Sequence, residues 1–403
     1  MALAGREVVV IGAGIVGMAA AAALALKGAR VRVLEQAPAL GEVGAGLQVG
    51  PNGVAVLEAL GLRDAGAARA SAPEAVELRD RDGSLVARVP MGADVLARHG
   101  RPYWQLHRAD LLALLEGAAK AAGVRIETGV RVARVVPGVA TGGGSGARPK
   151  LWTEAGASLD ADLIVAADGA RSRTRAHVFG GGVPRYAGSV AWRALVPAER
   201  LAQPHPEIAR VVMGPGRHVV SYPLRGGSLV NLVAIEERER GAEDGWMRVG
   251  DPAELRAAFA GWAPDVTDLL GAVDSVFVWG LHDHEPLPTW ARGGVVMIGD
   301  ACHPMLPFLA QGAGMGLEDA WVLAHELDVA GDITSGLAAY VNRRRERAER
   351  VQRAAAANGR IYHLSTPGVR QAAHLGLGLL SRLAPGRLLG RFDWLYGEDV
   401  TAG

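Results

Sequence analysis

The stretch "EVVVIGAGIVGMAAAAALALKGARVRVLE", residues Glu7–Glu35, decides the fold of this chain. Its β-branched start predicts a buried parallel strand at Glu7–Ile11, and the small residues after the glycines predict a helix at Ile15–Lys27. A second apolar run at Arg30–Glu35 predicts the next strand. Strand, helix and strand in this order indicate a βαβ unit, and therefore an α/β protein built on a parallel sheet.

The loop inside this unit, "GAGIVG", has the spacing G-x-G-x-x-G at Gly12, Gly14 and Gly17. Between a strand and a helix, such glycines allow a tight turn and let the helix start approach a pyrophosphate. Glu35, at the end of the second strand, stands where it can accept hydrogen bonds from an adenosine ribose. We therefore predict a Rossmann-like domain that binds a dinucleotide, and the fingerprint leaves both NAD and FAD open.

The uncharged run Val8–Leu26 is long enough to raise the alternative of a membrane span. Its glycines have turn spacing and its start is β-branched, which favours a strand, a turn and a helix. We expect a cytoplasmic protein without membrane association.

Net charge and cysteine content narrow the partners further. The 403 residues carry a formal net charge of +1, so bulk charge gives no case for nucleic acid. The charge-dense segment "NRRRERAERVQR", in a helix predicted at Ser335–Ala357, is typical of a solvated helix face and lacks aromatic residues that stack on bases. The single cysteine, Cys302, excludes an internal disulfide, fits a reducing compartment and is interpreted as a small buried residue.

Three further motifs follow predicted strands or open predicted helices. The stretch "GDACHPMLPFLAQGAGMG" begins with Asp300 after a buried strand and ends in glycines that open a helix near Gly312. Arg108 in "LHRADL" is a lone cation at a predicted helix start, and "AADGARSRTR" places Asp168 after another strand. A helix start offers free N–H groups and a partial positive charge, so these motifs predict an anionic or electron-rich ligand.

These motifs resemble those of the class A flavoprotein aromatic hydroxylases, which are single-component FAD monooxygenases. The N-terminal fingerprint, the central D-G motif and the G-D-A-x-H-P motif occur in the family's order, and the resemblance covers essentially the whole chain. It implies that the dinucleotide is FAD. By the resemblance, Asp300 binds the ribityl or ribose region and Arg108 the pyrophosphate region, the backbone of Val132 meets the adenine, and Gln48 lies close to the flavin. The helix start at Gly312 and Ala313 would direct its N–H groups at the flavin ring.

The segment "RHVVSYPLRGG" carries the candidate catalytic residues. On a strand, His218, Val220 and Tyr222 share one face, so two polar rings could meet a phenolic substrate. The same spacing is also typical of a core histidine and a tyrosine at a domain seam. The pattern H-x-x-x-Y-P-L is similar to that of 3-hydroxybenzoate 6-hydroxylases and 6-hydroxynicotinate monooxygenases. This resemblance implies that His218, with a pKa near neutrality, deprotonates the substrate hydroxyl and that Tyr222 orients the substrate.

The segment "HDHEPL" resembles a metal cluster at first sight. On a strand, His282 and His284 would share a face that Glu285 does not, and Pro286 ends the run. We therefore expect no metal site and no metal requirement.

The expected organisation follows the change of pattern along the chain. From Tyr186 to Ile235, alternating strands and short turns predict an antiparallel sheet, whereas "GVATGGGSGARPK", residues Gly138–Lys150, predicts a flexible surface loop. With the resemblance, the fold class is a glutathione-reductase-like FAD-binding domain, an antiparallel-sheet substrate domain and C-terminal helices. The expected bounds are 1–75, 98–181 and 280–330 for the FAD-binding domain, 76–97 and 182–279 for the substrate domain, and 331–403 for the helical region.

The resemblance implies an NAD(P)H- and FAD-dependent monooxygenase that hydroxylates a phenolic aromatic acid of the 3-hydroxybenzoate kind, para to the hydroxyl. NAD(P)H is expected as a transient co-substrate, since no second dinucleotide fingerprint is visible. Decarboxylative 1-hydroxylation of salicylate, another aromatic or polyketide tailoring reaction, and a non-catalytic FAD-binding protein are the alternatives. The expected partners are a small aromatic substrate, O2 and NAD(P)H, with the chain as a monomer or homodimer.

Overall fold

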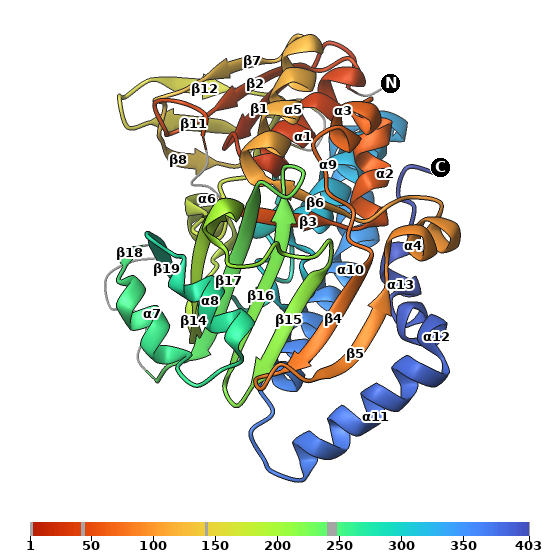
Figure 1. Cartoon of the computed structure of the whole chain (residues 1–403). Coiled ribbons are helices and arrows are strands. Elements are labelled where there is room, and N and C mark those ends of the chain that lie inside the picture. The colour runs from red at the N-terminus through yellow and green to blue at the C-terminus, as the bar shows by residue number, and fades with distance from the viewer. Residues whose placement is uncertain (1–2, 42–44, 142–143, 240–247, 403) are drawn as a thin grey trace.

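The computed structural model describes residues 3–41, 45–141, 144–239 and 248–402 (Figure 1). A six-stranded sheet occupies the upper half in Figure 1, with the strand order β20-β21-β13-β1-β2-β7. Its strands are parallel apart from the β20–β21 pair. Their bounds are β1 Glu7–Ile11, β2 Arg30–Leu34, β7 Arg125–Glu127, β13 Leu163–Ala166, β20 Ala291–Arg292 and β21 Val295–Met297. The βαβ opening predicted from the sequence is confirmed.

Helix α1, Ile15–Leu26, packs against both α5, Arg108–Ala121, and α9, Gly312–Val329. A glycine of α9 permits the close approach of α1 and α9. A Cβ added at Gly316 of α9 would lie 2.2 Å from a methyl carbon of Val16, so only glycine is accommodated there without a shift. The predicted start of a helix at Gly312 is correct.

An eight-stranded sheet forms the second layer, with the order β18-β19-β14-β17-β16-β15-β4-β5. All neighbouring strands are antiparallel except β15 and β4, which run parallel. The strands are β4 Ala75–Asp80, β5 Leu85–Pro90, β14 Arg185–Pro197, β15 Ala209–Gly214, β16 Arg217–Leu224, β17 Leu229–Glu237, β18 Arg248–Gly250 and β19 Val276–Asp283. The antiparallel sheet expected between Tyr186 and Ile235 is confirmed, while the domain bounds given above stay a prediction.

A short ladder lies between the two large sheets. Strand β3, Gly46–Val49, pairs antiparallel with β6, Trp104–His107. Because β6 leads directly into α5, this ladder fixes the position at which α5 begins.

The segment Gly138–Lys150 differs from the expected flexible loop. Strands β9, Val139–Thr141, and β10, Gly144–Ala147, pair as an antiparallel hairpin. The base of this hairpin is anchored, because the amide of Gly138 donates to the carbonyl of Gly293 at 2.7 Å. Beside it lies a small sheet of β8 Val132–Val136, β11 Lys150–Thr153 and β12 Ser158–Asp160.

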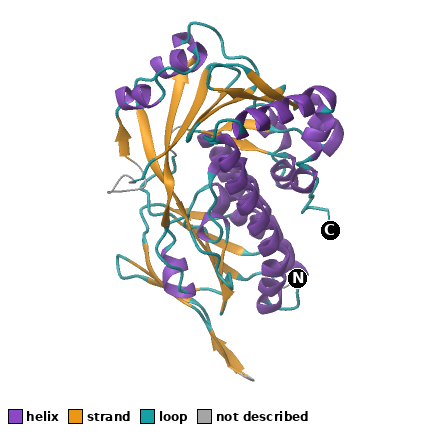
Figure 2. Ribbon diagram, turned by 90° about the horizontal axis from the view of Figure 1, so that it is seen from below, coloured by secondary structure: helices purple, strands orange, loops and turns teal. Residues whose placement is uncertain are grey.

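The longer helices lie along one side of the strands in Figure 2, and shorter helices lie at other positions around the sheets. The longest is α10, Ile333–Tyr362, which packs against α9. The remaining helical segments are α2 Pro51–Ala59, α3 Arg63–Ala67, α4 Gly92–His99, α6 Arg173–Phe179, α7 Pro252–Ala258, α8 Pro264–Gly271, α11 Val369–Leu383, α12 Pro385–Gly390 and α13 Asp393–Tyr396, with short turns η1 Ala198–Arg200, η2 Gly299–Ala301 and η3 Pro307–Leu309. None of the helices in the described ranges is both long and apolar enough to cross a membrane.

The charge-dense part of α10 is not purely a solvated face, which corrects the interpretation made from the sequence. The side chain of Arg344 is only 1% exposed and hydrogen bonds the carboxylates of Glu318 and Asp319 on α9. Arg347 also binds Glu318, at 2.7 Å. Two buried carboxylates on α9 therefore recruit arginines from α10, because a buried charge must be paired.

Candidate active site

Two cavities meet at the start of α1. The nucleotide cavity, of about 480 Å³, is lined by the fingerprint loop, the end of β2, β8 and the turn after β13. The central cavity, of about 330 Å³, lies between the two large sheets and is lined by α9, β3 and β16. Gly14, Ala167 and Gly169 line both cavities, so one elongated ligand can extend through them.

Glycine is required at each of the three fingerprint positions for a different structural reason. Gly12 has a φ of +99°, and a Cβ there would lie 2.5 Å from the carbonyl oxygen of Ala167. A Cβ at Gly17 would lie 2.0 Å from the carbonyl oxygen of Gly12, so this glycine permits close packing of helix and turn. A Cβ at Gly14 would meet nothing within 4 Å and would point into the space that a phosphate group needs.

Glu35 follows β2 and lines the nucleotide cavity. Its two carboxylate oxygens accept hydrogen bonds from the amides of Ala13 and Ala37, each at 2.8 Å. These bonds fix the carboxylate beside the fingerprint loop while leaving acceptor capacity for ribose hydroxyls. Val132, the first residue of β8, lines the same cavity.

Asp168, in the turn after β13, also faces the nucleotide cavity. Its Oδ1 atom is buried and has no hydrogen-bond partner among residues that the structure describes. Burial raises the pKa of this carboxyl. A buried acceptor of this kind fits a hydroxyl-bearing ligand, because an unmade hydrogen bond in this environment is costly.

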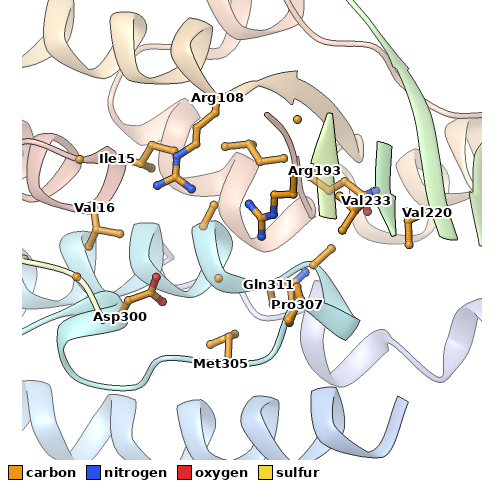
Figure 3. A pocket seen from close by; sticks show the side chains of 18 of the residues that line it. Ile15, Val16, Arg108, Arg193, Val220, Val233, Asp300, Met305, Pro307 and Gln311 are labelled. Atoms are coloured by element: carbon orange, nitrogen blue, oxygen red, sulfur yellow. The ribbon is translucent and has the colours of Figure 1, made fainter. Parts of the chain in front are cut away.

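Asp300 and Arg108 extend into the central cavity from opposite sides (Figure 3). Asp300 lies in η2 after β21, and Arg108 begins α5. Burial raises the pKa of the Asp300 carboxyl, although His303 and Arg108 act to lower it. Burial lowers the pKa of Arg108, opposed by Asp300. The pair offers one acceptor and one cation that face the same cavity, which fits a polyol and a pyrophosphate.

The start of α9 forms part of the wall of the central cavity. Gln311, Gly312 and Ala313 line the cavity, and the first N–H groups of this 18-residue helix have no acceptor within the helix. Gln48 of β3 lines the same cavity, and the hydroxyl of Tyr103 donates to its Oε1 at 2.5 Å. The arrangement suits a ring system that carries negative charge at the helix start.

His218 and Tyr222 lie on β16, and both line the central cavity. Burial and the nearby His363 hold the pKa of His218 well below its usual range, which differs from the expected near-neutral value. Burial raises the pKa of Tyr222, although Arg193 acts to lower it. His218 is therefore an uncharged imidazole at neutral pH, and Tyr222 is a protonated phenol.

Three important polar residues of this region are not among the site residues predicted from the sequence. Arg193 of β14 lines the central cavity, and its guanidinium lies over the ring of Trp279 at 5.2 Å. Its buried Nε atom has no hydrogen-bond partner in the described part of the chain. A lone arginine inside the apolar strand "SVAWRALVP" was a usable signal. No local pattern marks His363 or Glu237, whose contacts with the site are described below.

The remaining candidates lie outside this site or are inert. His282 and His284 are bonded to the carbonyls of Gly280 and Ala170, at 2.9 Å and 2.8 Å. Cys302 is buried, and burial raises the pKa of its thiol well above the usual range. Such a thiol is a packing group and not a nucleophile.

Comparison with known proteins points to one family. Residues 6–355 match the family model described as FAD binding domain. The chain is 38% identical to 3-amino-4-hydroxybenzoate 2-monooxygenase of Streptomyces cremeus, covering 98% of this chain and 96% of that protein. The identity is 36% to 6-hydroxynicotinate 3-monooxygenase of Bordetella bronchiseptica and 34% to 3-hydroxybenzoate 6-hydroxylase of Polaromonas naphthalenivorans, each again covering 98% of this chain and 96% of the relative.

Two solved structures share the fold over nearly the whole chain. Klebsiella pneumoniae HpxO complexed with FAD and uric acid superposes with a TM-score of 0.83 at 28% identity, covering 99% of this chain and 97% of that one. A salicylate hydroxylase substrate complex superposes with a TM-score of 0.80 at 28% identity, with the same coverage.

Proposed function

Because the chain belongs to the FAD-binding family of aromatic monooxygenases, we propose that it hydroxylates a phenolic aromatic acid of the 3-hydroxybenzoate kind, para to the ring hydroxyl. FAD is the cofactor, and NAD(P)H is the reductant typical of this family. The observation that carries the substrate class is that an uncharged His218 and the cation of Arg193 line the same cavity.

The residues of the two cavities would hold FAD as follows. Glu35 accepts the adenosine ribose hydroxyls, the backbone at Val132 meets the adenine, and Gly14 leaves room for the pyrophosphate. Arg108 neutralises the pyrophosphate and Asp300 accepts the ribityl hydroxyls. Gln48, Gly312 and Ala313 adjoin the flavin ring. When bound, FAD supplies the activation of O2 and the transfer of one oxygen atom to the substrate.

The substrate would lie between charged and apolar surfaces of the central cavity. Val220, Val233 and Ile235 provide an apolar wall for an aromatic ring. Arg193 pairs with the ring carboxylate, because a guanidinium in a poorly solvated cavity binds an anion strongly. With the carboxylate held by Arg193, the ring hydroxyl, which is meta to the carboxylate, would face His218 and Tyr222, which line the same cavity.

The two rings of β16 then have separate roles. His218 is unprotonated and can accept the proton of the substrate hydroxyl, which makes the ring electron-rich at its para carbon. Tyr222 stays protonated, because burial raises its pKa, and it donates a hydrogen bond that orients the bound phenolate. The apolar wall excludes water from this contact.

The test is a substrate panel on the FAD-loaded enzyme. We would measure product formed per NAD(P)H consumed, together with peroxide and CO2, for 3-hydroxybenzoate, salicylate, 6-hydroxynicotinate and 3-amino-4-hydroxybenzoate. Coupled formation of the 2,5-dihydroxy acid from 3-hydroxybenzoate is expected. Coupled turnover of salicylate with CO2 release, and none of 3-hydroxybenzoate, would replace the proposal with decarboxylative hydroxylation.

A further inference from the structure

His218 is joined to a second histidine that does not line the central cavity. Its Nδ1 lies 2.7 Å from Nε2 of His363, the residue that caps the C-terminal end of α10. His218 is 1% exposed, and the rings of Phe308 and Tyr362 flank it at centroid distances of 5.5 Å and 5.2 Å. These rings shield the imidazole, so a proton taken up from the substrate cannot pass directly to bulk water.

His363 is in turn joined to the surface. Its Nδ1 lies 2.8 Å from Oε1 of Glu237, the last residue of β17. The imidazole of His363 is 5% exposed, whereas the side chain of Glu237 is 58% exposed. Two backbone hydrogen bonds through Gly216 hold the end of β17 beside the end of α10. The Glu237 amide donates to the carbonyl of Gly216 at 2.9 Å, and the Gly216 amide donates to the carbonyl of His363 at 3.3 Å.

The chemistry of the three groups fixes where the protons lie. An ionised carboxylate only accepts hydrogen bonds, so His363 must carry its proton on Nδ1 and present a lone pair at Nε2. His218 then donates from Nδ1, and its own lone pair is on Nε2. Among the described residues, Nε2 of His218 takes no hydrogen bond, and the ring lines the cavity where the substrate hydroxyl is proposed.

We propose that His218, His363 and Glu237 form a proton relay that carries the substrate's hydroxyl proton from the central cavity to solvent. The relay rests on the proposed function for its proton source. One proton enters at Nε2 of His218, the Nδ1 proton of His218 moves to Nε2 of His363, and the Nδ1 proton of His363 moves to the Glu237 carboxylate. Glu237 then releases one proton to water, so the chain of groups gains and loses one proton.

The electrostatics of the site favour transfer of the proton to solvent over its retention on either histidine. Burial and His363 hold the pKa of His218 well below its usual range, and burial lowers the pKa of His363 despite the opposing effect of Glu237. A buried imidazolium is therefore costly at either position. Transfer of the proton to the Glu237 carboxylate removes the positive charge from the buried imidazoles. The side chain of Glu237 is exposed, so water can then take the proton.

The first test reads the protons directly and needs no substrate. In FAD-loaded enzyme labelled with 15N-histidine, we expect His218 and His363 both in the Nδ1–H form at neutral pH, assigned with His218→Asn and His363→Gln. A His218 that carries its proton on Nε2 would overturn the relay, whatever the enzyme's substrate is.

The second test follows the proton that leaves. A pH indicator in a stopped-flow experiment reports proton release when FAD-loaded enzyme binds 3-hydroxybenzoate. Glu237→Gln keeps the size and exposed position of the side chain but cannot take up a proton, so release should slow at least about tenfold. Small buffers such as imidazole should restore it. The control is Glu116→Gln on α5, whose carboxylate pairs with Lys120 at 2.6 Å.

The outcomes separate the relay from the proposed function. Unchanged release in Glu237→Gln would overturn the relay even if 3-hydroxybenzoate is hydroxylated. No release in wild-type enzyme, with both tautomers as expected, would remove 3-hydroxybenzoate as the substrate and leave the relay standing.

Discussion

The Oδ2 atom of Asp319 accepts a hydrogen bond from the backbone amide of Gly299 at 2.9 Å, which ties α9 to the turn that carries Asp300. The same carboxylate binds His303 at 2.5 Å and Arg344 at 2.7 Å. One buried side chain thus sets the distance between the start of α9, proposed to adjoin the flavin ring, and Asp300, proposed to hold the ribityl chain.

Replacing this carboxylate should cost stability. Burial opposes its ionisation, but His303 and Arg344 lower the pKa of Asp319 to about 2. In Asp319→Asn, the buried Arg344 loses one of the two carboxylates that neutralise its charge and keeps only Glu318. We therefore expect a loss of about 3 kcal/mol in the free energy of unfolding. Chemical denaturation of FAD-free protein measures it, with the exposed-site variant Asp160→Asn as control. An Asp319→Asn protein as stable as wild type would contradict this assignment.

Asp300 should control cofactor retention without controlling the fold. Its side chain lines the central cavity, and Asp300→Ala removes a hydrogen-bond acceptor for cofactor hydroxyls. We expect FAD to bind about ten- to a hundredfold more weakly. Fluorescence titration of the FAD-free protein measures the affinity. Unchanged affinity would place the ribityl chain elsewhere.

Loss of His218 should uncouple reduction from hydroxylation. In His218→Ala, hydroxylation should slow on the order of a hundredfold while cofactor reduction is nearly unchanged, because the ring is no longer activated. Reducing equivalents should then appear as peroxide, and raising the pH should partly restore product. Tyr222→Phe should mainly weaken substrate binding. Full coupling in His218→Ala at neutral pH would end the general-base assignment.

Arg193 should distinguish acids from neutral phenols. Arg193→Gln removes a half-buried cation that lines the central cavity, so affinity for 3-hydroxybenzoate should fall about tenfold or more. The neutral analogue 3-hydroxybenzamide is the control ligand and should bind equally to both proteins. Perturbation of the bound-flavin spectrum gives both dissociation constants. An equal loss for both ligands would mean that Arg193 shapes the cavity without reading the carboxylate.

Buried imidazoles should make the protein sensitive to mild acid. Burial lowers the pKa of His218 and of His363 in the folded protein, whereas unfolded histidine has a pKa of about 6.5. The unfolded chain therefore binds more protons below that pH, and stability falls as the pH drops from about 6.5 toward the lower folded values. Melting temperatures at neutral and mildly acidic pH test this, and His218→Asn should show a smaller drop than wild type.

The parts of the site that were predictable from sequence are those whose chemistry is local. Gly12, Gly14 and Glu35 are constrained by one turn and one strand end, so a short motif carries their geometry. The start of α9 at Gly312 is likewise set by neighbouring residues.

The parts that were missed depend on distant segments meeting. His363 and Glu237 are brought to His218 only when the end of α10 packs on the large sheet, and no spacing in the sequence records that contact. The pKa of His218 was misjudged for the same reason, since burial by Phe308 and Tyr362 comes from tertiary packing. The hairpin within Gly138–Lys150 was missed because its pairing is anchored by Gly293, far along the chain.

The long helix α10 is held in its middle by Arg344 and delivers His363 at its end. An α-helix turns about 100° and rises about 1.5 Å with each residue. Adding or removing a single residue between these two points would swing His363 away from His218, although every side chain was kept. Among homologues that keep this contact, the residue types on the outer face of α10 should therefore vary widely, whereas the length of α10 between these two residues should vary little.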